Sequence, residues 1–186
     1  MNKKVAAALS SGAALALALT GCSDDSGKET DAWAKKVCDK VQPEVKKIQE
    51  ANTSINEASK EKSSSEEVKE TDAAAFEKIS GAYKSLGTAV DEAGPPPVDD
   101  GEKLHQDAVK ELRAISEKYG QLRKTVDGLD TKDQAKFAEG LQGVATKLDA
   151  LGKSGDKALS KLQSGDVGKA MADQQGCKRP ANSPKV

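Results

Sequence analysis

Apolar side chains recur every three or four residues along most of this chain, which is the period of an α-helix that buries one face. The first such stripe covers residues 33–55, and either Thr30 or Asp31 before it can cap the helix. Pro43 lies inside the stripe, so we expect it to kink this helix or split it in two. Cys38 lies beside the stripe, where its sulfur can face a partner element.

A second helix is predicted over residues 68–90, where the last five apolar positions are spaced 3, 4, 3 and 4 residues apart. The polar segment 56–65 before it predicts a loop or a frayed helix end. Ser64 and Glu67 have the spacing of a capping box, in which each side chain accepts from the other residue's backbone N–H. The block 94–97, Gly-Pro-Pro-Pro, should end the helix, because proline cannot continue a helix and restricts the residue before it.

Two further stripes, over residues 104–126 and 137–151, predict a third and a fourth helix. Asp99 or Asp100 can cap the third helix. The connection 127–130 is short, so we expect the fourth helix to return antiparallel to the third.

The end of the chain predicts one more short element. Thr131 and Gln134 have the spacing of another capping box at the start of the fourth helix. Ser-Gly at 164–165 should end that helix, and the apolar positions within 167–171 indicate a short last helix. Gly176 follows as a natural C-cap position just before the last cysteine.

The first 21 residues have the order of a secretory signal peptide, with a positive start, an apolar run over 5–19 and small residues before Cys22. A membrane-spanning helix is one alternative, but the run is short for a span of about 20 residues, and Ser-Ser-Gly at 10–12 interrupts it. A signal cut at an alanine, which would leave Cys22 as a free thiol, is another.

Leu19-Thr20-Gly21-Cys22 resembles the lipobox of bacterial lipoproteins, in which the cysteine is lipidated and becomes the first mature residue. The resemblance implies cleavage between Gly21 and Cys22 and a diacylglycerol thioether on Cys22. Because two acyl chains anchor a protein stably where one does not, it also implies a lasting attachment to the extracytoplasmic face of the cell membrane. The run 165–177 is similar to the end of small secreted lipoproteins of actinobacteria, a likeness that implies no function.

We therefore expect a signal peptide over 1–21, a flexible tether over 22–30, one helical domain over 31–177 and a disordered tail over 178–186. Two cysteines remain in the domain of this exported chain, for which a disulfide is the default. A redox or metal pair is the alternative, which the lack of a CxxC motif and the single histidine disfavour.

No strand pattern accompanies these stripes. The sequence predicts an all-α fold, an antiparallel four-helix bundle with a short C-terminal helix. A disulfide between Cys38 and Cys177 would link that last helix to the start of the first one.

The charge balance excludes a nucleic-acid binder. The chain has 29 basic and 30 acidic residues, and loss of Lys3 and Lys4 with the signal leaves a net charge of −3, without the concentrated basic excess that such proteins carry. Charged residues make up 32% and aromatic residues 3%, a composition typical of a well-solvated helical protein with a thin core.

The sequence contains few candidates for a catalytic or metal-binding site. His105 is the only histidine, and Glu102-x-x-His105 matches one element of di-iron bundles, but those sites need a second such element. We therefore expect no metal or other cofactor and interpret His105 as a surface residue. No nucleophile elbow, Walker or dinucleotide motif is present, and the carboxylates lie among lysines at helical spacing, so we predict no enzyme. Gly140 and Gly143 could leave a local groove.

The sequence supports a lipid-anchored extracytoplasmic protein whose helical domain serves as a binding or interaction module of the cell envelope. Its partner would be an envelope protein or a cell-wall polymer. The alternative is a bundle that binds a small molecule, a lipid or a metal, and a persistent apolar cavity would favour it.

Overall fold

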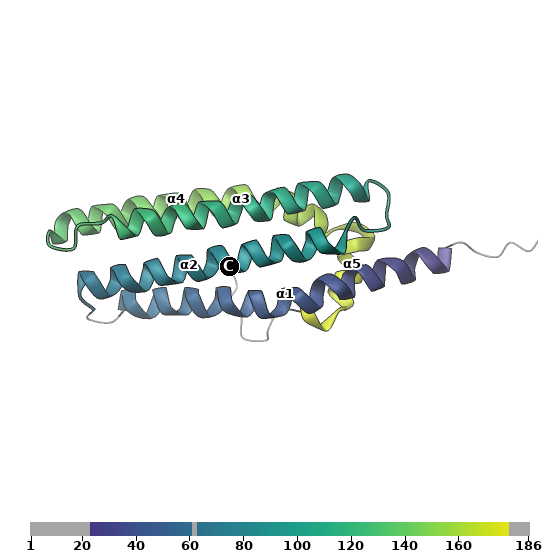
Figure 1. The fold of residues 1–186 in the computed structure, drawn as a ribbon, viewed down its shortest axis with the longest axis horizontal. Coiled ribbons are helices and arrows are strands. Elements are labelled where there is room, and N and C mark those ends of the chain that lie inside the picture. The colour runs from purple at the N-terminus through teal and green to yellow at the C-terminus, as the bar shows by residue number, and fades with distance from the viewer. Residues whose placement is uncertain (1–22, 61–62, 179–186) are drawn as a thin grey trace, which may run out of the picture.

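The computed structural model describes residues 23–60 and 63–178, and all regular structure within them is helical. The elements in Figure 1 are α1 Ser23–Lys60, α2 Ser65–Ala93, α3 Gly101–Asp127, α4 Gln134–Leu162, α5 Gly165–Asp173 and a short 3-10 helix, η1 Gln175–Cys177. The predicted all-α class, with four long helices and a short C-terminal one, is confirmed. Residues 1–22 and 179–186, with the predicted signal peptide, Cys22 and most of the tail, lie outside the described residues.

The first helix is longer and more continuous than its sequence indicates. α1 runs through Pro43 without a break, so of the two expected outcomes, a kink or a split, the split is wrong. Pro43 is exposed. Its ring lies on the solvent side of the helix, where water can bind the backbone carbonyl that proline leaves without a hydrogen bond. The helix also begins at Ser23, so most of the segment 22–30 is helical where a flexible tether was expected. Extending an existing helix is far easier than nucleating one, and the buried Thr30 shows that this end is already packed.

The boundaries of α2 follow the prediction. Ser64 forms the capping box: its Oγ accepts from Glu67 N at 3.3 Å, and its own N donates to Glu67 Oε2 at 2.7 Å. Gly94 ends the helix with a φ of 76°, a conformation that favours glycine. The loop that follows is fastened to α1, because Trp33 Nε1 donates to Gly94 O at 2.7 Å.

Three predicted side-chain caps do not form. Thr30 and Asp31, expected to cap the first helix, lie inside α1. Asp100 precedes α3 with a φ of 58° and makes no side-chain cap bond. At α4 the cap is Asp133, whose Oδ1 accepts from the backbone N–H groups of Ala135 and Lys136 at 3.1 Å each. Thr131 lies two residues before this cap, since α4 begins at Gln134, and its hydroxyl instead donates to Glu66 at the start of α2. A contact between helices thus replaces the local cap that the spacing indicated.

The bundle is open on one side. Consecutive helices run antiparallel (Figure 1), and α2 with α3 forms the most extensive pair, flanked by α1 on α2 and α4 on α3. α1 and α4 hardly contact each other. One group of buried side chains, at the α5 end, contains Trp33, Val37, Cys38, Leu86, Val90, Leu112, Val167 and Met171. The other, toward the opposite end, contains Phe76, Ile79, Ile115, Leu122, Val126, Val144 and Leu151.

The predicted disulfide is confirmed. Cys38 on α1 and Cys177 in η1 are bonded, with their Cα atoms 5.0 Å apart at a sequence separation of 139. Gly176 lies inside η1 and is not the helix cap that was expected. A Cβ at Gly176 would clash with the backbone carbonyl of Cys38, so this close approach of η1 to α1 requires glycine.

Candidate functional site

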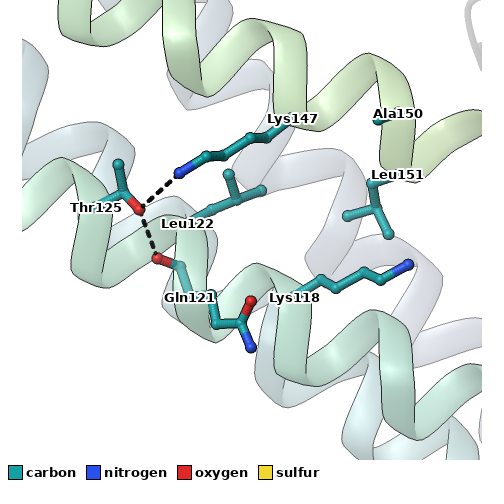
Figure 2. Close-up of a pocket in the computed structure, with 7 residues that line it drawn as sticks. All are labelled: Lys118, Gln121, Leu122, Thr125, Lys147, Ala150 and Leu151. Carbon is teal, nitrogen blue, oxygen red and sulfur yellow. Dashed lines mark hydrogen bonds between the residues drawn. The ribbon is translucent and has the colours of Figure 1, made fainter.

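A groove of about 390 Å³ runs between α3 and α4. We call it the α3–α4 groove, and the residues that line it are Lys118, Gln121, Leu122, Thr125, Lys147, Ala150 and Leu151. The antiparallel return of α4 brings these two segments, more than 20 residues apart, onto facing surfaces. Figure 2 shows both leucines pointing into the space between the helices, with one lysine from each helix beside them.

The floor of this groove is apolar and its rim is basic. Leu122 and Leu151 belong to the core, with 3% and 6% of their surfaces exposed. Lys147 extends from α4 to α3 and donates to Thr125 Oγ1 at 3.5 Å, while that hydroxyl donates to Gln121 O at 3.0 Å. None of the seven lining residues is acidic. Such a surface can bind a small molecule that has an apolar part and an anionic group.

The groove does not lie where the glycines indicated. The space beside Gly140 is filled by Leu129, and a Cβ at Gly143 would contact nothing, which is an open helix surface. Only the facing of α3 and α4 creates the α3–α4 groove, and no local sequence signal marks it.

A second groove, of about 500 Å³, lies on the other face of α3, toward α2. Its lining is of mixed charge: Asp91, His105, Gln106, Val109, Lys110, Arg113, Ala114 and Glu117. Arg113 Nη2 donates to Asp91 Oδ2 at 2.7 Å and ties α3 to the end of α2. The acidic and basic groups largely neutralise one another here, so this groove favours neither an anionic nor a cationic ligand.

His105 lies in this second groove and is not the surface residue that was expected. Only 13% of its side chain is exposed, because α2 covers the start of α3. Its Nε2 is buried without a hydrogen-bond partner among the described residues, and Asp91 Oδ1 is 3.9 Å away. Glu102 does not join it, since that carboxylate accepts from Gln106 Nε2 at 2.6 Å. Within the described ranges no three His, Cys, Asp or Glu side chains come together as a metal site.

A buried carboxylate on α2 escaped the sequence analysis. Asp72 is 7% exposed, its Oδ1 has no hydrogen-bond partner among the described residues, and burial raises its pKa from 3.8 to about 6. The signal was present, because Asp72 lies four residues from both Val68 and Phe76, at the one gap in an otherwise regular apolar stripe.

Two tyrosines stack in the middle of the bundle. The rings of Tyr83 and Tyr119 are nearly parallel, at 9°, with centroids 5.7 Å apart. Burial, with a smaller contribution from Tyr83, raises the pKa of Tyr119 to about 12. Both phenols therefore stay protonated at neutral pH and serve packing.

Neither a protein-family model, nor a curated protein, nor a solved structure matches the chain. No helix in the described part of the chain is both long and apolar enough to cross a membrane. The predicted site residues thus divide into two sets: Cys38 and Cys177 are brought together, whereas Gly21 and Cys22 lie outside the described residues.

Proposed function

We propose that this chain is an extracytoplasmic lipoprotein, held on the cell membrane by a lipid on Cys22, whose helical domain is a binding or interaction module of the envelope. The observation that carries the proposal is that two of the three cysteines form a disulfide and the third lies in the lipobox-like motif. Cys38 and Cys177 are joined in a disulfide, a bond that persists in oxidising compartments outside the cytoplasm. The remaining one, Cys22, is the residue of the lipobox-like Leu19-Thr20-Gly21-Cys22.

The fold supports an orientation for such a protein. α1 begins one residue after Cys22, and its first turn lies at the same end of the bundle as the α2–α3 loop (Figure 1). The end of α1, the start of α2 and the α3–α4 connection lie at the opposite end. A helix of 38 residues is about 57 Å long, so a lipid on Cys22 would hold the first end near the bilayer and extend the other away from it. The long helix faces would then meet an envelope protein or a cell-wall polymer.

Replacement of Cys22 tests the anchor. We expect Cys22→Ala to accumulate as an unprocessed precursor or to leave the membrane fraction, while Ser23→Ala fractionates like the wild type. The intact mass of the native protein provides a second measurement. It should equal residues 22–186 plus a diacylglycerol unit, less two hydrogens until a reductant opens the disulfide. A trimmed N-terminus without lipid, in protein that still sediments with membranes, would refute the proposal.

Crosslinking in the native cells tests the interaction role. A short amine-reactive crosslinker would attach to the exposed lysines and should give a discrete adduct with an envelope protein or with cell-wall fragments. The Cys22→Ala protein is the matched control, because it keeps the same helical domain but lacks the lipid that would hold it at the membrane. Adducts that are equally abundant in both would contradict an interaction that depends on anchoring.

A further inference from the structure

The α3–α4 groove places a lysine that has no carboxylate three or four residues away beside apolar side chains. Several exposed lysines in the described part of the chain pair with a carboxylate three or four residues away, as in Lys35–Asp39, Lys103–Asp107 and Lys169–Asp166. Lys147 has no acidic residue at these spacings, since the positions are Gly143, Val144, Ala150 and Leu151. Its ammonium donates a hydrogen bond to the Thr125 hydroxyl at 3.5 Å.

This ammonium lies beside apolar surface. Leu122 and Leu151 line the groove next to it, and the exposed methyl group of Ala150 continues the apolar surface along α4. Lys118, on α3, borders the same leucines (Figure 2), and the carbon stem of such a side chain can cover an apolar ligand while its charged end stays in water.

We propose that the α3–α4 groove binds a single-chain fatty acid. The carboxylate would accept hydrogen bonds from Lys147 Nζ, and the acyl chain would lie on Leu122 and Leu151 beneath the stem of Lys118. This site does not depend on lipidation of Cys22, so it stands or falls separately from the anchor.

The size of the groove selects this ligand class. A volume of about 390 Å³ lies near the lower end of the roughly 300–1,000 Å³ typical of small-molecule sites, which suits one short chain rather than a two-chain phospholipid. A protein partner needs an interface of about 1,000 Å² or more, and seven side chains around two leucines do not provide it. The basic rim favours an anionic head group over an alcohol.

Photocrosslinking tests the site in the full-length protein within native membranes. The probe is dodecanoic acid with a diazirine in its chain, and the readout is the position of the adduct after digestion and mass spectrometry. We expect adducts on the peptides of α3 and α4 that contain Leu122 and Leu151. Unlabelled dodecanoate should compete with the probe, and inorganic phosphate should not.

Two variants address the two halves of the site. Lys147→Glu reverses the charge, and Ala150→Phe fills the groove while keeping both lysines. Each should reduce groove adducts about tenfold, the effect of one lost charge-assisted contact or of a blocked floor. Lys124→Glu makes the same charge change at an exposed position of α3 outside the groove and should leave labelling unchanged. Circular dichroism melts establish that all three variants fold.

The outcomes that overturn the proposal are specific. Adducts outside α3 and α4, or equal labelling of Lys147→Glu and Lys124→Glu, would show that the groove is not the site. Competition by dodecanol as strong as that by dodecanoate would overturn the role of Lys147. Stronger competition by dodecyl phosphate than by dodecanoate would overturn the assignment of the head group as a carboxylate.

Discussion

Asp72 should make this protein less stable as the pH rises through mildly acidic values. Its carboxyl group lies within the apolar stripe of α2, 7% exposed, with Oδ1 unpaired among the described residues. Burial raises its pKa from 3.8 to about 6, so between these values the folded state keeps a proton that the unfolded state has released. Stability is therefore complete below about pH 3.8, falls as the pH rises, and levels off above about 6.

The size of the loss follows from the shift. A change from 3.8 to about 6 corresponds to about 3 kcal/mol at 1.36 kcal/mol per pKa unit. Residual contact with solvent screens the charge, so we expect the measured loss to be about 1–3 kcal/mol. Asp72→Asn has nearly the same shape but cannot ionise, so it should lack this loss. Asp72→Leu should also exceed the wild type in stability at pH 7.5, because it adds apolar contact at the gap in the stripe.

Urea unfolding, followed by circular dichroism at pH 4 and pH 7.5, measures the effect. The quantity to compare is the difference in unfolding free energy between Asp72→Asn and the wild type. Three other carboxyl groups have pKa values lowered by hydrogen bonds: Glu67, Asp107 and Asp133. Their effect on stability has the opposite pH dependence, and because it is present in both proteins it cancels in this difference. The difference should grow by about 1–3 kcal/mol from pH 4 to pH 7.5. A difference that does not change with pH would refute the assignment.

Three further predictions concern the fold, all measured by urea unfolding. Asp133→Ala should cost about 1 kcal/mol through loss of the α4 cap and Thr131→Ala less, and the reverse order would restore the capping box as the true cap. Trp33→Phe should cost about 1 kcal/mol, because the ring stays buried while the bond to Gly94 O is lost; an unchanged stability would show that the bond contributes nothing. Cys177→Ala should cost about 2–5 kcal/mol, and added reductant should lower the wild type by a similar amount but leave the variant unchanged.

The helices could be predicted because their signals are local. The apolar period fixes which face of each segment is buried, and Gly94 with the prolines after it ends α2 whatever surrounds it. The errors arise where a tertiary contact decides. Thr131 has the right spacing for a cap but bonds to Glu66 of another helix, and His105 is covered by α2 although its own sequence neighbours resemble a solvated first turn.

The α3–α4 groove could not be predicted for the same reason, because a tertiary contact creates it. Lys147 and Thr125 are ordinary surface residues in their own helices, and only the antiparallel return of α4 places one beside the other. Asp72 is the exception, because a stripe that skips from Val68 to Phe76 leaves position 72 facing the core. A polar residue at such a gap should have been interpreted as buried.

The disulfide links the first and last helices of a bundle in which α1 and α4 do not form a packed pair. α1 and α4 hardly contact each other, so packing between these two long helices does not close the bundle. α5 fills this position at one end, where Val167 and Met171 pack into the same core as Trp33 and Val37, and η1 carries Cys177 onto Cys38. An element of nine residues is too short to hold itself there by helix propensity. The bond closes a loop of 139 residues, where loop closure restricts the unfolded chain most, and so compensates for the missing contact between α1 and α4.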